Sequence, residues 1–372
     1  MALLPVVGEV RRVGWTRISR GVHLPDAATS SLECRARAWG MVLPASAVIT
    51  HLSAAALRGW WLPRTPVELP FFVATPRDLP RPRRRGLHVV RHDRPPVVEK
   101  FRGLPLATSA DTVLACARDL ALLDLIVLVD GALRVGDCSM DALTDLARQP
   151  KRGAPRLREA LRLTDHRSES AGESLLRVLH VVCAVPVEPQ LVIQDGEGYV
   201  VARADLRIAG TKRLPEYDGA YHRDAAQYER DRSRDRRLRT LGWDPYSYSA
   251  VSLFQTPSVI LREADQALGR DHDPARLDRW RDLWAESSYS DTGKARLRRS
   301  IRRQQLMSPA QAHEVVSNCI PNSSSLAVTD HLDQLIIEGG AEQPRCGIGN
   351  TGRRAHWSPR ADVEEVTGRH DV

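Results

Sequence analysis

The sequence predicts an α/β protein of the α+β type, in which a mixed central sheet flanked by helices follows a smaller, mainly helical N-terminal domain. Residues 200–208 alternate apolar and polar side chains, which is typical of a strand with one buried face. Stripes with helical spacing precede and follow this strand at 168–183 and 228–242. Further strands are predicted at 189–194, around Glu216 and Asp218, and at 246–251. The order is therefore helix, hairpin, strand, helix, strand, which indicates a mixed sheet with flanking helices.

Length and charge indicate two domains and make a nucleic acid a reasonable partner. The chain has 372 residues, and 42% of them are hydrophobic, which is enough for ordinary globular cores. The formal net charge is +8, and most basic residues are arginines, which suit bidentate contacts to phosphate. A compositional bias of the genome would explain the same arginine content.

The cysteines and the apolar segments indicate the cellular compartment in which the protein is expected. The six cysteines are scattered without the spacing of a zinc site, so we expect a reducing cytoplasm and no disulfide framework. Cys116 and Cys183 lie in apolar helical runs and are expected in the core. The sequence has no basic-then-apolar leader and no apolar run of about 18 residues, so we expect neither secretion nor a membrane partner.

Shifts in composition divide the chain into five regions. Residues 149–155 are polar and hold two prolines and a glycine, which is typical of a domain boundary. Beyond about residue 305 the periodicity is lost, which indicates disorder. The predicted regions are an N-terminal domain (1–148), a linker with a basic helix (149–164), a second domain (165–252), a helical extension (253–304) and a largely disordered tail (305–372).

The N-terminal domain leaves several alternatives open. Its first 25 residues are β-prone and basic, so Arg20 belongs either to the wing of a winged-helix remnant or to a solvated hairpin. His51 is expected to be a hydrogen-bonded structural histidine rather than a functional one. Between two strand-like segments lies a loop that is either a phosphate-contacting patch or merely solvated, and it carries Arg83, Arg84 and Arg85.

Acidic residues gather on the central strands. Asp205 lies on the polar face of the strand at 200–208, and Glu216 and Asp218 are two residues apart and so point to the same side. A loop then delivers His222. If the two strands pair, three carboxylates and an imidazole converge, a ligand set that suits Mg²⁺ or Mn²⁺. Such an ion would activate a water and stabilise a phosphodiester transition state, whereas the alternative is a set of solvated hairpin charges.

Glu173 also has two interpretations. Ser170-Ala-Gly-Glu173 has the pattern of a capping box, in which Glu173 bonds back to the start of its helix. In the functional interpretation, Glu173 is a carboxylate that leans towards Asp205. Basic residues of the later arginine-rich helix are expected to hold a nucleic-acid backbone, namely Arg232, Arg234 and Arg236.

The second half of the chain resembles a nuclease family. The signals are Glu173 on a helix, Asp205 on a strand, Glu216-Tyr-Asp-Gly219 with His222, and an Arg-Asp pair before Leu-Gly-Trp243. Over residues 165–252 they resemble actinobacterial proteins with a very-short-patch-repair-type endonuclease-like domain of the PD-(D/E)xK nuclease superfamily. The first half resembles the antitoxin-like domain of abortive-infection toxin–antitoxin systems, through Arg20-Gly-Val22 and Thr50-His-Leu-Ser-Ala-Ala55.

The resemblance implies a restriction-endonuclease-like fold and a metal-dependent DNA endonuclease in DNA repair or phage defence. It implies that Asp205 and Glu216 bind Mg²⁺ or Mn²⁺ and that Glu173 assists them. His222 and Arg234 would supply proton transfer or charge stabilisation.

Two positions depart from the pattern of the superfamily. Asp218 stands where a lysine is usual, and Pro215 enters the strand beside Glu216. The alternative is therefore a non-catalytic, antitoxin-like regulator with a degenerate nuclease domain, which binds operator DNA or a cognate toxin protein.

Overall fold

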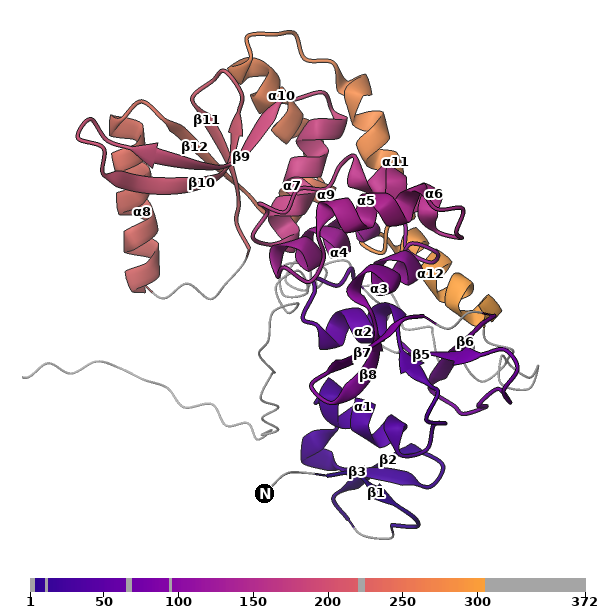
Figure 1. The fold of residues 1–372 in the computed structure, drawn as a ribbon. Helices are drawn as coiled ribbons and strands as arrows, with labels where there is room; N and C mark the ends of the chain where they lie inside the picture. Colours follow the sequence, from indigo (N-terminus) through magenta and orange to yellow (C-terminus); the bar gives the residue numbers. More distant parts are fainter. Residues whose placement is uncertain (1–3, 11–12, 65–68, 94–95, 220–224, 305–372) are drawn as a thin grey trace, which may run out of the picture. The chain divides into compact units, whose positions relative to one another are not determined.

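The computed structural model describes residues 4–10, 13–64, 69–93, 96–219 and 225–304 and shows a mixed α/β protein (Figure 1). These ranges contain twelve α-helices and twelve strands, so the predicted α+β class is confirmed. None of the described helices combines the length and the apolar character that crossing a membrane requires. The predicted tail at 305–372 lies outside the described residues.

The chain begins with a small antiparallel sheet. Its strands, in the order β1-β3-β2, are β1 (Val6–Val7), β3 (Val22–Pro25) and β2 (Trp15–Ser19). Gly21 turns the chain between β2 and β3 at φ 76°, where a side chain would be strained. Helix α1 (Leu32–Gly40) packs Ala38 against this sheet. A winged-helix remnant and an N-terminal hairpin would both contain such a sheet, so the two interpretations stay open.

A second, five-stranded sheet makes the N-terminal half less helical than predicted. Its order is β6-β5-β4-β8-β7, with β4 (Val48–Ile49), β5 (Phe71–Pro76), β6 (Leu87–His92), β7 (Val98–Phe101) and β8 (Leu104–Ala107). Strands β5 and β6 match the two strand-like segments of the sequence. The other three have two to four residues, too few to show a period. The prediction of a mainly helical domain is therefore wrong.

Helices form the centre of the described protein. They are α2 (His51–Leu57), α3 (Ser109–Cys116), α4 (Leu122–Arg134), α5 (Met140–Arg148), α6 (Ala154–Leu161) and α7 (Ala171–Val182). Helix α4 is apolar on nearly all sides and is buried accordingly. Cys116 and Cys183 are buried, as predicted. One hydrophobic cluster runs from Leu52 to Ile301 and includes residues on both sides of the predicted linker at 149–164.

Two strand pairs lie close together in the second half of the chain (Figure 1). Strands β9 (Val187–Gln194) and β10 (Val200–Ile208) are antiparallel, whereas β11 (Arg213–Tyr217) and β12 (Asp244–Tyr248) are parallel and are connected through α8 (Ala225–Thr240). Helix α8 contacts β10 and β12, and α7 contacts β9 and β11. The strands are thus of mixed direction with flanking helices, but they form two sheets rather than one.

The expected pairing of the two acidic strands is wrong in detail. Strands β10 and β11 contact each other but belong to different sheets. The N–H of Tyr217 donates to Oδ2 of Asp205 at 2.8 Å instead of to a backbone carbonyl. Pro215, two residues earlier, has no N–H to donate. A side-chain contact therefore connects β10 to β11 where the sequence predicted a backbone ladder.

The C-terminal extension returns to the N-terminal half. It consists of α9 (Ala250–Phe254), α10 (Pro257–Ala267), a 3₁₀ turn, α11 (Asp278–Glu286) and α12 (Asp291–Gln304). The N–H and the hydroxyl of Ser288 donate to the buried carboxylate of Asp124 on α4, at 2.9 to 3.1 Å. The hydroxyl of Ser300 donates to Oδ1 of Asp119 at 3.2 Å. These contacts fix α12 beside the end of α3.

Candidate functional site

Three carboxylates from different elements lie close together, and we call them the carboxylate cluster: Glu173 on α7, Asp205 on β10 and Glu216 on β11. The charges of Glu173 and Glu216 both act on Asp205. Glu173 is only 9% exposed, and the side chain of Glu216 is 14% exposed. The structure therefore brings together three of the residues that the sequence singled out.

Asp205 is the most strongly perturbed member of the cluster. Burial, followed by the charge of Glu173, raises the pKa of Asp205 from 3.8 to about 7. The N–H of Tyr217 and the charge of Arg234 act in the opposite direction. Oδ2 of Asp205 accepts the N–H of Tyr217, whereas Oδ1 forms no hydrogen bond with another described residue. Near neutral pH this carboxyl group is thus on the border between its two protonation states.

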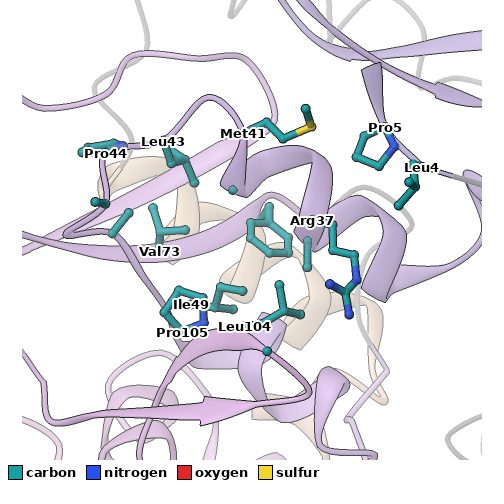
Figure 2. A pocket seen from close by; sticks show the side chains of 16 residues that line it. Leu4, Pro5, Arg37, Met41, Leu43, Pro44, Ile49, Val73, Leu104 and Pro105 are labelled. Carbon is teal, nitrogen blue, oxygen red and sulfur yellow. The ribbon is translucent and has the colours of Figure 1, made fainter. Parts of the chain in front are cut away.

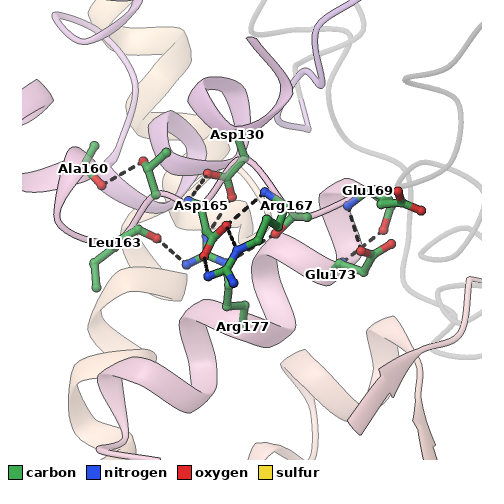
Figure 3. Close-up of polar contacts among 11 residues, drawn as sticks. Asp130, Ala160, Leu163, Asp165, Arg167, Glu169, Glu173 and Arg177 are labelled. Carbon is green, nitrogen blue, oxygen red and sulfur yellow. Dashed lines mark hydrogen bonds and ion pairs between the residues drawn. The ribbon is translucent and has the colours of Figure 1, made fainter. Parts of the chain in front are cut away.

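Glu173 combines the two roles that the sequence suggested. Ser170 caps α7, and its hydroxyl accepts the N–H of Glu173 at 3.1 Å. Oε2 of Glu173 accepts the N–H of Glu169 at 2.7 Å, just before the helix (Figure 3). The same oxygen also accepts an N–H from Nε2 of Gln190 at 2.9 Å. Burial raises the pKa of Glu173. The same carboxylate therefore fixes the start of its helix and acts on Asp205.

Sequence reasoning missed Gln190. It lies in β9 with a left-handed φ of 57°, and its amide fixes one oxygen of Glu173. A glutamine in a half-exposed strand gives no periodic signal, and a left-handed residue inside a strand is not visible in the residue type. Only the distance to Glu173 identifies it as part of the site.

A buried ion pair anchors α7 behind the cluster (Figure 3). Nη2 of Arg177 donates to Oδ2 of Asp130 at 2.7 Å, and Nη1 donates to the carbonyl of Leu163 at 2.6 Å. Oδ1 of Asp130 accepts the N–H of Asp165 at 2.8 Å. Burial raises the pKa of Asp130 to about 6 although the charge of Arg177 lowers it. Helix α7 is thereby fixed to α4, which holds Glu173 in place.

Glu216 is neutralised by Arg234. The guanidinium of Arg234 on α8 donates to both carboxylate oxygens at 2.6 and 2.8 Å, in the bidentate geometry of a strong pair. Nη2 also donates to the carbonyl of Arg203 at 3.2 Å. The pKa of Arg234 is raised, mainly by Glu216. Arg234 therefore lies in the site, as predicted, but as the partner of Glu216, which the sequence predicted to bind the metal.

Close packing of α7 on β11 brings the carboxylates together. A Cβ added at Gly172 would overlap the ring of Tyr217, so only glycine permits this approach. Tyr217 follows Glu216 and donates its N–H to Asp205. The contact between Gly172 and Tyr217 thus sets the distance between the helix that carries Glu173 and the two acidic strands.

Asp218, His222 and a metal ion were also predicted to belong to the catalytic site. Asp218 follows β11, where its N–H donates to the carbonyl of Tyr248 at 2.9 Å. His222 lies outside the described residues. Within the described residues, no group of three or more histidine, cysteine, aspartate or glutamate side chains is arranged to hold a metal ion. The cluster has the hard oxygen donors that Mg²⁺ prefers, but a cation would have to replace Arg234 at Glu216.

The predicted nucleic-acid contacts are exposed with one exception. Arg20, Arg83 and Arg85 are exposed in the N-terminal half, and Arg232 and Arg236 are exposed on α8. Nη1 of Arg84 instead donates to the hydroxyl of Ser19 and to the carbonyl of Arg20, at 3.2 and 2.8 Å. Arg84 therefore connects its loop to the N-terminal sheet.

His51 is buried but is not the hydrogen-bonded histidine that the sequence predicted. Neither ring nitrogen has a hydrogen-bond partner within the described ranges, and Nε2 lies 3.7 Å from Oδ2 of Asp119. The ring stacks on Phe72 at 5.4 Å between centroids. Burial, followed by the charges of His88 and Arg118, lowers the pKa of His51 well below 6.5, so the ring is neutral at pH 7.

An apolar pocket of about 510 Å³ lies between α1 and the five-stranded sheet (Figure 2). Leu4 and Pro5 cover one side, and Ile49, Val73 and Leu104 are among the apolar residues that line it. Arg37 lies at the rim, but its guanidinium is paired with Glu33 at 2.7 Å. No residue of the carboxylate cluster lines this pocket, so it is separate from the candidate site.

Comparisons with known proteins add little to this description. The chain is 27% identical over 149 residues to the uncharacterized proteins MT2308 and Rv2248 of Mycobacterium tuberculosis, from strains CDC 1551 and H37Rv respectively. The match covers 39% of this chain and 55% of each relative, so the chain spans about half the length of the curated relatives it matches. No family model matches the chain, and no solved structure gives a significant match.

Proposed function

We propose that this protein is a metal-dependent, DNA endonuclease-like phosphodiester hydrolase with a restriction-endonuclease-like second half. The supporting observation is the convergence of Glu173, Asp205 and Glu216 from α7, β10 and β11, in the chain order that the sequence resemblance implies. Buried carboxylates that repel one another are costly to fold. A functional reason to keep them together is a bound cation, which would relieve that repulsion.

Asp205 and Glu216 are the residues that would hold Mg²⁺ or Mn²⁺, and Glu173 would assist them. Asp205 would release its proton and offer Oδ1, and Glu216 would release one oxygen from Arg234. A bound divalent ion supplies a nucleophilic water at neutral pH and compensates charge on a phosphoryl oxygen. Arg234 would keep one contact to Glu216, and its released N–H would be available to donate to a phosphate oxygen.

A cleavage assay with supercoiled plasmid and short mismatched duplexes tests this proposal. The full chain is incubated with Mg²⁺, Mn²⁺ or EDTA beside Asp205→Ala and Glu216→Ala. We expect nicking that needs the metal and is lost in both variants. Glu188→Ala is the matched control, because Glu188 is a half-exposed carboxylate of the adjacent β9 that pairs with Arg207 at 3.4 Å. Nicking that persists in both cluster variants would contradict the site.

The bidentate pair of Glu216 with Arg234 favours a second candidate function, a non-catalytic and antitoxin-like regulator. In that case Arg234 replaces the cation permanently, and the cluster is the remnant of a nuclease site. The protein would then bind operator DNA or a cognate toxin protein without any effect of Mg²⁺. Duplex binding that depends on salt, with no cleavage in any metal, would support this function over the first.

A further inference from the structure

Helix α12 has a buried apolar side that fixes it to the N-terminal half. Leu297 and Ile301, one turn apart, are 4% and 5% exposed and belong to the main hydrophobic cluster. They line a small gap together with His51 and Asp119. The hydroxyl of Ser300, between them, donates to Oδ1 of Asp119 at 3.2 Å. The second half of α12 is thus fixed against residues of the N-terminal half of the chain.

The first turn of α12 is fixed as well. A Cβ added at Gly293 would overlap the carbonyl group of Ser287, so the helix begins in direct contact with the preceding backbone. The N–H of Gly293 donates to the hydroxyl of Ser290 at 2.9 Å. Both ends of the described helix are therefore attached to the protein, and its outer face has a defined orientation.

The outer face carries three arginines that have no partner among the described residues. Arg298, Arg299 and Arg302 are exposed, and none of them forms a hydrogen bond or an ion pair with a described residue. Two other basic residues of this helix differ, because Lys294 pairs with Asp291 at 3.1 Å and Arg296 pairs with Glu286 at 2.9 Å. Like charges one turn apart on a helix repel one another by a few tenths of a kcal/mol, roughly. The three arginines therefore do not stabilise the isolated chain.

We propose that the outer face of α12 binds the phosphate backbone of duplex DNA. Guanidinium groups at positions i, i+1 and i+4 of a fixed helix suit neighbouring phosphates, with which arginine forms bidentate contacts. An anionic membrane fits less well, because a membrane-surface helix needs a free apolar face and that of α12 is buried in the protein. The surface is independent of the carboxylate cluster and of catalysis.

The test is duplex binding by the full chain in EDTA, measured by fluorescence anisotropy over a range of salt concentrations. The variant replaces Arg298, Arg299 and Arg302 with glutamine. We expect affinity to fall about tenfold to hundredfold, and the slope of log K against log salt to fall by about 2 to 3, since each lost phosphate contact removes about 0.9. Lysine at the same three positions is expected to restore most of the binding.

The matched control removes the same charge elsewhere, through Arg148→Gln, Arg279→Gln and Arg281→Gln. These arginines are exposed and each is paired with an acidic residue, at 2.8 to 2.9 Å. An equal loss of affinity in the control would overturn the proposal, as would wild-type affinity in the α12 variant. Tighter binding to phosphatidylserine vesicles than to duplex, lost in the same variant, would overturn the choice of partner.

Failure of this inference and failure of the nuclease proposal are distinguishable. Asp205→Ala should bind duplex in EDTA like the natural chain if α12 contacts DNA, whether or not any metal supports cleavage. If the variant without the three α12 arginines cleaves DNA normally and binds duplex with unchanged affinity, only the role of α12 is refuted.

Discussion

Replacing Asp205 with asparagine is expected to stabilise the fold at alkaline pH. Burial and then the charge of Glu173 raise the pKa of Asp205 from 3.8 to about 7, so the folded chain keeps a proton that the unfolded chain releases above pH 4. The free energy of unfolding therefore falls as the pH rises from about 4 to about 7. At about 1.4 kcal/mol per pKa unit, Asp205 lowers the free energy of unfolding by at most about 4 kcal/mol at pH 8 and by about 1.6 kcal/mol at pH 5.

Urea unfolding in EDTA at pH 5 and pH 8, followed by tryptophan fluorescence, measures the effect. The amide oxygen of asparagine can still accept the N–H of Tyr217. The variant should therefore have a higher free energy of unfolding than the natural chain, and this difference should be about 2 kcal/mol larger at pH 8 than at pH 5. Asp282→Asn at an exposed carboxylate is the control and should change little at either pH. An advantage of the Asp205 variant that is equal at both pH values would refute the reasoning.

Two further predictions concern the packing behind the site. Gly172→Ala should lower the free energy of unfolding by about 1 to 3 kcal/mol, because the added Cβ overlaps the ring of Tyr217. Gly196→Ala is the control in the same urea assay and should be nearly neutral, because its added Cβ meets no atom within 4 Å. Asp130→Ala leaves a buried arginine unpaired and should cost about 3 to 5 kcal/mol, against about 0 to 1 kcal/mol for Asp145→Ala at an exposed pair. Equal losses of unfolding free energy in Asp130→Ala and Asp145→Ala would show that burial does not strengthen the pair of Asp130 with Arg177.

The sequence predicted those elements whose periodicity is long enough to read. The alternation at 200–208 corresponds to β10, and the apolar stripe that begins after Ser170 corresponds to α7. The strand of two residues at Val48–Ile49 carries no period, yet it joins the two halves of the five-stranded sheet. The prediction of a mainly helical N-terminal domain failed for this reason.

The site was predictable in its residue types and not in its contacts. Spacing along the strands selected Asp205 and Glu216, and the structure places both in the carboxylate cluster. The pairing of Glu216 with Arg234 and the contact of Glu173 with Gln190 depend on how separate elements pack. Such long-range geometry leaves no local pattern in a single sequence.

The return of α12 to the N-terminal half has a consequence for synthesis on the ribosome. The hydrogen bond between Asp119 and Ser300 joins residues 181 positions apart, and that between Asp124 and Ser288 joins residues 164 apart. At roughly 5 to 20 residues per second, the ribosome needs about 10 to 35 seconds to reach Ser300 after Asp119. Throughout that interval the apolar surface that Leu297 and Ile301 later cover is open, so the nascent chain is a natural client for a chaperone until its last described helix emerges.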